Sequence, residues 1–155
     1  MTRPDQVLSI SGLEHVRSQA GVRFMLRVPA LSLARGEFAA LVGPSGCGKS
    51  TLLDILGLVL RPDRVRTFSL AVPGGGLDLA GLGQGRRASV RSRYLGYVLQ
   101  TGGLLPFLSV AANIALPLRL NQTYAPGTVR AMAAALGIEE QLDKLPSFLS
   151  GGQRQ

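Results

Sequence analysis

The chain has 155 residues, 46% of them hydrophobic, which is enough for one compact domain with its own core. Its formal net charge is +8. The arginines are scattered, apart from a loose group at Arg86, Arg87, Arg91 and Arg93, and no aromatic side chains lie between them; we therefore interpret the charge as a solvated face and expect no nucleic-acid partner. The single cysteine excludes an internal disulfide and a cysteine-rich zinc site.

Neither the N-terminal residues nor the apolar middle of the chain predicts a targeting or membrane segment. Residues 1–6 lack the apolar centre of a signal peptide. Residues 95–118 carry no charged side chain, but the glycine pair at 102–103 and the prolines at 106 and 117 interrupt a continuous helix. We interpret this stretch as buried soluble structure.

The first predicted elements are short strands. Residues 7–11 alternate between apolar and polar side chains, as in an edge or half-buried strand, and residues 22–28 give a second candidate, so that the pair predicts a hairpin. Residues 31–33 predict a third short strand. Residues 35–37 predict a turn into the next strand.

The most informative stretch is a candidate phosphate loop, residues 43–51. It matches the pattern of a glycine, four residues, a glycine, a lysine and a hydroxyl residue. The apolar run at 38–42 before it predicts a buried strand of a parallel sheet, and residues 51–58 after it have helical spacing. The full stretch reads Gly43-Pro44-Ser45-Gly46-Cys47-Gly48-Lys49-Ser50-Thr51.

This arrangement is suited to holding the phosphates of ATP. Glycines let successive backbone N–H groups turn toward one anion, and the following helix adds the partial positive charge of its N-terminus. Lys49 is expected to bring a point charge to the β- and γ-phosphates, Ser50 to ligate Mg²⁺, and Thr51 to place a hydroxyl near the α-phosphate. The alternative is a glycine turn before a helix with a solvated lysine. The residues predicted to bind nucleotide here are Gly43, Ser45, Gly46, Gly48, Lys49, Ser50 and Thr51.

The helix after the phosphate loop is expected to end near residues 60–62. Residues 65–72 then predict a strand, residues 73–76 a loose loop, and residues 88–93 a short basic helix. Residues 94–100 predict a central strand that ends in the polar Gln100.

Beyond Gln100 the pattern becomes helical. Residues 109–116 have Ser109 at a candidate N-cap, and residues 128–136 are alanine-rich and end before Gly137. Residues 138–145 predict another helix, closed by Pro146. Together these elements predict a helical subdomain.

Two motifs together resemble one family, the ATP-binding subunits of ABC transporters. Leu149-Ser150-Gly151-Gly152-Gln153 matches the signature sequence of that family and follows a phosphate loop in the same chain. Gln100 lies between them, where the family's Q-loop glutamine is expected. The resemblance extends from Val7 to Gln155, and residues 104–118 are similar to the lipoprotein-release and macrolide-export type.

The resemblance implies a fold and further site residues. The implied fold is an α/β P-loop NTPase, with a RecA-like core, a small antiparallel β subdomain and a helical subdomain, incomplete at the C-terminus. Residues 1–155 are expected to form a single ATP-binding domain, with the β subdomain and core in residues 1–100 and the helical subdomain in residues 101–155. By resemblance, Gln100 senses Mg²⁺ and the attacking water, and the signature faces the γ-phosphate bound by a second subunit. The implied signature contacts are Ser150, Gly151, Gly152 and Gln153.

The implied function is coupling of ATP binding and hydrolysis to transport in bacteria. A subunit of this kind resembles a cytoplasmic protein that docks peripherally on transmembrane permease subunits at the inner membrane, and it dimerises head to tail. ATP and Mg²⁺ are the implied ligands. The adenine contact departs from the family, because Arg17 or His15 occupies the position of its stacking aromatic residue, with Phe24 the one aromatic residue nearby.

The larger departure is at the end of the sequence. The family places an Asp that supports Mg²⁺, a Glu that polarises water and a switch histidine after the signature, and we expect this chain to lack them. One alternative is therefore a truncated, catalytically inactive nucleotide-binding fragment. Another is a DNA-acting ATPase of the ABC superfamily, although those carry zinc cysteines or a long coiled-coil insertion. A phosphate-loop kinase would not require the signature.

Overall fold

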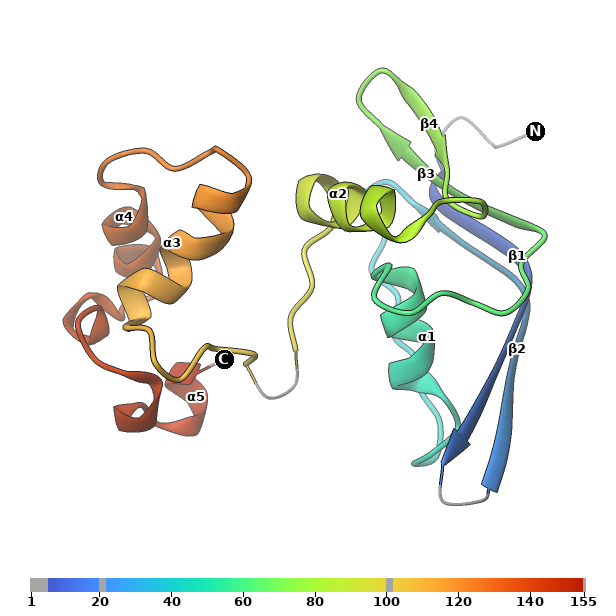
Figure 1. The fold of residues 1–155 in the computed structure, drawn as a ribbon, viewed down its shortest axis with the longest axis horizontal. Coiled ribbons are helices and arrows are strands. Elements are labelled where there is room, and N and C mark those ends of the chain that lie inside the picture. Colours follow the sequence, from blue (N-terminus) through green and yellow to red (C-terminus); the bar gives the residue numbers. More distant parts are fainter. Residues whose placement is uncertain (1–5, 20–21, 100–101, 155) are drawn as a thin grey trace. The chain divides into compact units, whose positions relative to one another are not determined.

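The computed structural model describes residues 6–19, 22–99 and 102–154. The chain divides into two compact units, residues 1–95 and residues 96–155. The described strands all belong to the first unit, and the second consists of short helices (Figure 1).

A long antiparallel hairpin dominates the first unit. Strand β1 (Gln6–Gln19) pairs with β2 (Val22–Ala34), which confirms the predicted hairpin. The predicted third strand at residues 31–33 is wrong, because these residues continue β2 and pair with residues 8–10 of β1. The apolar alternation changes phase near Gly12, whose φ is +57°: Leu8 and Ile10 are buried before it, and Leu13 after it. That change of phase follows the end of the predicted strand at residues 7–11, whereas β2 was divided in the prediction at Pro29.

Two shorter strands complete the sheet. Strand β3 (Thr67–Val72) pairs with β1, and β4 (Gly75–Asp78) pairs with β3, so that the order is β2-β1-β3-β4. The strand predicted at residues 65–72 is thus confirmed with a later start. Phe68 and Leu70 of β3 are buried, and the residues between them are less so, as expected for a sheet with one covered face.

Helix α1 (Lys49–Leu56) covers that face. Its buried residues Leu52 and Ile55 belong to the same hydrophobic cluster as Ile10 and Phe68. The helix ends earlier than predicted, since Leu58 has a positive φ of 59° and its side chain is only 1% exposed. Helix α2 (Gln84–Tyr94) is longer than the predicted helix at residues 88–93 and lies on the same side of the sheet as α1 (Figure 1).

The two strands predicted for a central parallel sheet are not formed. Residues 38–42 have no regular structure, and Phe38 and Val42 are 93% and 89% exposed. Tyr94 closes α2, residues 95–99 are irregular, and Gln100 lies outside the described residues. Neither segment pairs with any strand in the described ranges, and a lone extended segment has no ladder of hydrogen bonds to hold it.

The second unit contains helices α3 (Val110–Leu120), α4 (Thr128–Ala135) and α5 (Gly151–Arg154). Ser109 caps α3 by accepting a hydrogen bond from the Ala112 N–H at 3.2 Å, and Gly137 has a φ of +65° after α4, so both predicted ends are confirmed. The helix predicted at residues 138–145 is reduced to the 3₁₀ turn η1 (Glu139–Gln141), followed by η2 (Pro146–Phe148). Across the described ranges, no helix has the length and apolarity to cross a membrane.

Candidate nucleotide-binding site

The phosphate loop has the backbone conformation that its glycines predicted. Gly43, Gly46 and Gly48 have φ values of +155°, +80° and +94°. Such angles are accessible to glycine but strained for other residues, and they let neighbouring N–H groups face one side of a loop. The N–H of Cys47 is hydrogen-bonded to the Pro44 carbonyl at 3.4 Å, which closes the turn.

Lys49, the first residue of α1, folds back over this loop. Its Nζ donates to the Gly43 and Pro44 carbonyl oxygens, at 2.8 Å each, and lies 3.8 Å from Cys47 Sγ. The ammonium therefore lies beside the loop and the N-terminus of α1, which carries a partial positive charge. An anion at this position would be attracted by both the Lys49 ammonium and the N-terminus of α1.

The hydroxyl residues that follow have different environments. Thr51 is buried at 4% exposure, and Ser50 in the first turn of α1 is exposed, as is Ser45 in the loop. Mg²⁺ commonly combines one or two protein ligands with phosphate oxygens and water, so an exposed Ser50 hydroxyl fits that role. In the part of the chain that the structure describes, no group of three histidine, cysteine or acidic side chains could hold a metal by itself.

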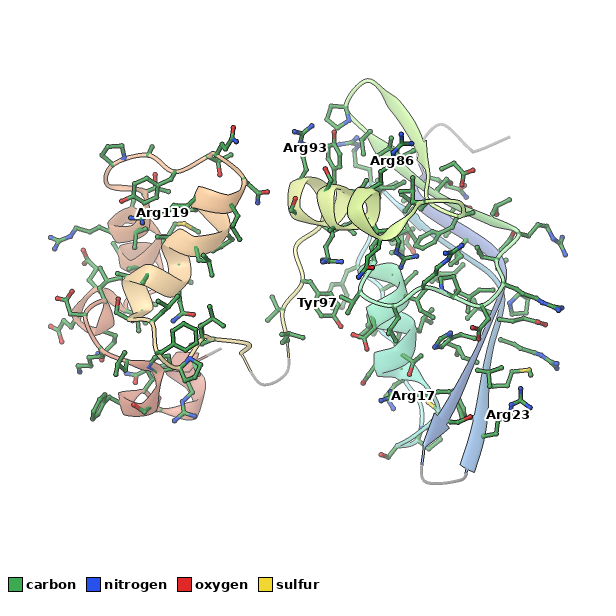
Figure 2. The ribbon with its side chains drawn as sticks, in the orientation of Figure 1. Arg17, Arg23, Arg86, Arg93, Tyr97 and Arg119 are labelled. Atoms are coloured by element: carbon green, nitrogen blue, oxygen red, sulfur yellow. The ribbon has the colours of Figure 1, made fainter. Side chains whose placement is uncertain are left out.

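The hairpin supports the loop from behind. A Cβ added to Gly48 would lie 2.8 Å from Phe24 Cζ and 3.3 Å from Leu26 Cδ1, so the loop backbone approaches β2 closely. Arg17 pairs with Phe24 across the two strands. Figure 2 places the exposed Arg17 beside the lower end of α1, near the phosphate loop. These two residues are therefore candidates for the contact with the base.

His15 has a structural role instead. Its side chain is 14% exposed, and its Nδ1 lies 3.3 Å from Asp63 Oδ2. The same carboxylate oxygen accepts a hydrogen bond from the Val16 N–H at 2.6 Å. His15 and Asp63 thereby fix the segment after α1 to β1.

The signature forms the start of α5 in the second unit. Ser150 and Gln153 cap each other: the Gln153 N–H donates to Ser150 Oγ at 3.3 Å, and the Ser150 N–H donates to Gln153 Oε1 at 3.0 Å. This reciprocal pair is a capping box with Gln in the fourth position. Gly151 and Gly152 are exposed, with nothing near a Cβ added to either, and Leu149 anchors the turn at 5% exposure.

Two features were not anticipated from the sequence. Asn113 joins α3 to the preceding loop: its Nδ2 donates to the Leu105, Leu108 and Ser109 carbonyls, and its Oδ1 accepts from the Leu105 N–H at 2.8 Å. No sequence pattern distinguished it from other polar helix residues.

The interpretation of the basic group as a solvated face is wrong for two of its members. Arg87 is 5% exposed and donates to the Leu60 carbonyl, and Arg91 donates to the Leu58 carbonyl at 2.8 Å. Their spacing of four residues places both on one face of α2, a signal that the sequence did contain. Arg86 and Arg93 are exposed and rise from the side of α2 that faces away from α1 (Figure 2).

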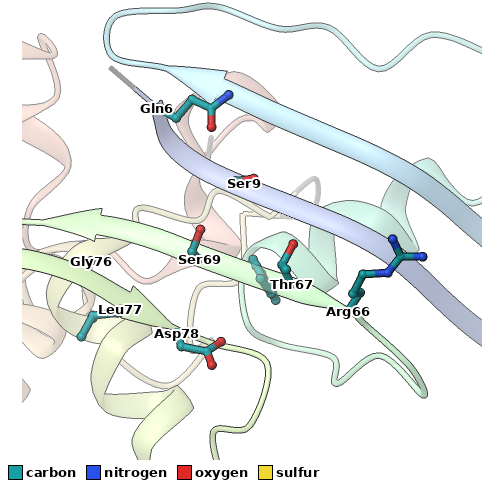
Figure 3. A pocket seen from close by; sticks show the side chains of 9 residues that line it. Gln6, Ser9, Arg66, Thr67, Ser69, Gly76, Leu77 and Asp78 are labelled. Carbon is teal, nitrogen blue, oxygen red and sulfur yellow. The ribbon is translucent and has the colours of Figure 1, made fainter. Parts of the chain in front are cut away.

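A separate polar pocket of about 460 Å³ lies on the sheet itself (Figure 3). Ser9, Thr67 and Ser69 contribute to it from β1 and β3, and Asp78 from β4. Because Ser9 and Ser69 alternate with core residues, this pocket occupies the face of the sheet opposite α1. It is therefore distinct from the phosphate loop.

Comparisons with known proteins agree with these motifs. The family model described as ABC transporter matches residues 26–155. The lipoprotein-releasing system ATP-binding protein LolD of Bordetella pertussis is 43% identical over 129 residues, which is 81% of this chain and 54% of that protein. LolD of Cereibacter sphaeroides is 37% identical over 155 residues, covering 97% of this chain and 67% of the relative.

Solved structures show the same fold. The ATP-binding cassette MJ0796, in a dimeric post-hydrolysis state bound to ADP and Pi, superimposes with a TM-score of 0.78 at 25% identity, over 95% of this chain and 65% of that one. The predicted α/β P-loop NTPase class is thus confirmed. The chain spans about half the length of the Bordetella relative.

Proposed function

Since the chain belongs to the ABC transporter family, we propose that it supplies the ATP-binding residues of a bacterial transporter subunit that couples ATP binding and hydrolysis to transport. The lipoprotein-releasing type is supported by the names of the relatives reported above. By the same likeness, the subunit would lie on the cytoplasmic face of the inner membrane, docked on transmembrane permease subunits.

One observation carries the proposal: the Lys49 ammonium lies over a loop with three positive-φ glycines at the start of α1. In this role the backbone N–H groups of residues 43–48 hold phosphate oxygens, and Lys49 exchanges the Gly43 and Pro44 carbonyls for the β- and γ-phosphates of ATP. The Ser50 hydroxyl is the protein ligand for Mg²⁺. Mg²⁺ held by this hydroxyl would supply positive charge to the phosphate oxygens.

The finer assignments are also proposals. Thr51 and Ser45 contribute hydroxyls on either side of the lysine. Gln100, which lies outside the described residues, is the proposed metal and water sensor. Arg17 and Phe24 are the proposed base contacts, so that a guanidinium contributes where the family uses an aromatic ring.

We assign the signature to a second copy of the subunit. Ser150, Gly151, Gly152 and Gln153 face the γ-phosphate held by the partner's phosphate loop in a head-to-tail dimer. Support comes from the exposed glycines, which leave the backbone accessible, and from the dimeric state of MJ0796. The Ser150 hydroxyl, already at the start of a helix, would need only to turn toward the anion.

Nucleotide binding can be tested with matched lysine variants. Mg-ATP binding by calorimetry should weaken in Lys49→Ala by roughly tenfold to a hundredfold, the effect of losing a charge-assisted hydrogen bond. Lys144→Ala removes the same charge from an exposed residue and should bind as the unchanged chain does. Equal affinity in the two variants would refute the role of the phosphate loop.

The head-to-tail arrangement has its own test. Gly152→Glu has open space in the monomer but would oppose a phosphate with a negative charge. In a mixture of Lys49→Ala and Gly152→Glu chains, only the mixed dimer retains one intact site. ATP should therefore drive mixed dimers, measured by light scattering, while each variant alone stays monomeric. Association of either variant alone would contradict the arrangement.

A further inference from the structure

A second pocket lies between the end of α1 and helix α2, within the first unit. Its volume is about 480 Å³, in the range of small-molecule sites. Three arginines, Arg61, Arg87 and Arg91, and the amide of Gln84 form its polar lining, and the rest is apolar. We call it the arginine pocket. No acidic side chain of the described ranges lines it.

Two of the arginines are fixed in place. Arg87 donates through Nη2 to the Leu60 carbonyl, and Arg91 donates through Nη1 to the Leu58 carbonyl. Each guanidinium has five N–H donors, so one hydrogen bond leaves most of them available. Ordered guanidinium groups lose little entropy when they bind an anion.

The positive charge in the arginine pocket is not neutralised. Among the described residues, neither Arg87 nor the other two arginines form an ion pair, and Arg61 also has no hydrogen-bond partner. Burial first, and then the charges of Arg61 and Arg91, lower the pKa of Arg87 from its ordinary value. An anion in this cavity would therefore be attracted by all three guanidinium groups and would offset their mutual repulsion.

Capping of the α1 terminus explains only part of this arrangement. Arg87 and Arg91 satisfy carbonyl oxygens after the helix, a role that needs no third arginine. Arg61 contributes nothing to that cap, yet it lines the same cavity. Gln84 is the first residue of α2, whose N-terminus has no side-chain cap, so the partial positive charge of this helix also acts on the pocket.

We propose that the arginine pocket binds the dianionic phosphoryl group of free phosphate or of a small phosphomonoester, at a site separate from the phosphate loop. Guanidinium groups match phosphate oxygens in paired hydrogen bonds. A dianion balances the three charges better than a single carboxylate does. The size of the cavity leaves room for an organic group attached to the phosphate.

Site-resolved NMR of the arginine Nε–Hε groups tests this in the full chain. Inorganic phosphate should shift the signals of Arg61, Arg87 and Arg91 with saturation. Arg61→Gln, an exposed residue without a partner, should keep the fold and raise the dissociation constant about tenfold, as loss of one charge-assisted contact predicts. Arg86→Gln removes the same charge on the outer side of α2 and should have no effect.

Two further measurements distinguish free phosphate from a phosphomonoester, and the arginine pocket from the phosphate loop. Glycerol 3-phosphate binding more tightly than phosphate identifies a phosphomonoester, and equal binding identifies the phosphoryl group alone; both support the proposal. Lys49→Ala should leave the phosphate-induced shifts of the arginine signals unchanged while it weakens ATP binding. Phosphate binding in the arginine pocket and ATP binding at the phosphate loop are thereby tested independently. The proposal is overturned if no shift saturates, if Arg61→Gln and Arg86→Gln behave alike, if Lys49→Ala abolishes the shifts, or if acetate binds equally well.

Discussion

Gly48 lies against the ring of Phe24, so closely that a Cβ on the glycine would be 2.8 Å from Cζ and 2.9 Å from Cε1. The phosphate loop is therefore positioned by the hairpin as well as by its own turn. Any side chain at this glycine must displace either the loop or the aromatic ring.

Gly48→Ala should destabilise the chain more than Gly46→Ala. Both residues have positive φ, +94° and +80°, so each alanine incurs backbone strain of about 1–2 kcal/mol. Only Gly48→Ala adds a steric clash, which costs about 1–3 kcal/mol more. Urea denaturation measures the difference, and Phe24→Leu should restore part of it. Equal losses in the two variants would show that Phe24 does not support the loop.

Asn113 is expected to hold the second unit together. Asn113→Ala leaves the Leu105 N–H and three carbonyls without their side-chain partner and should lower the free energy of unfolding by about 2–3 kcal/mol. Asn113→Asp keeps the acceptor for Leu105 but loses the donors. Hydrogen exchange at the Leu105 amide should therefore accelerate in the alanine variant and stay slow in the aspartate variant. Similar acceleration in both would contradict this assignment.

The capping box of the signature predicts that substituting either Ser150 or Gln153 changes hydrogen exchange at the amide of the other residue. Ser150→Ala removes the acceptor of the Gln153 N–H, and Gln153→Ala removes the acceptor of the Ser150 N–H. Each substitution should therefore speed hydrogen exchange severalfold at the other residue's amide, with a cost near 1 kcal/mol. If a variant affected only its own amide, the reciprocal cap would not exist in solution.

The arginines of α2 should differ in their effect on stability. Arg87→Ala leaves the Leu60 carbonyl without its partner and a cavity beside α1, so it should cost about 2–4 kcal/mol. Arg86→Ala, at an exposed position one residue away, should change stability by less than about 0.5 kcal/mol. Thermal unfolding of the two variants provides the measurement, and a similar shift in both would place Arg87 at the surface.

The sequence predicted local features well. Alternation of apolar and polar residues located the hairpin, and loop and cap chemistry located the phosphate loop, Ser109 and Gly137, because each depends on a few adjacent residues. The signature was found in the same way. These features need no distant partner to form.

Features that depend on distant partners were missed. The run at 38–42 has the composition of a buried strand, but a strand also needs a neighbour, and no residue pattern within five positions reports one. The prediction ended the first strand before the change of phase at Gly12 and divided β2 at Pro29, because alternation was read without the pairing of the two strands. Arg87 and Asn113 acquire their partners from other elements, Leu60 and Leu105, which only the folded chain brings together.

The exposed run at residues 38–42 also has a consequence in the cell. Phe38 and Val42 are almost fully exposed, and no charged residue lies between them in the sequence. Short apolar segments of this kind are the sequences that self-associate and that quality-control machinery recognises. Covering those five residues with another segment or a partner would therefore lower the tendency of this polypeptide to self-associate.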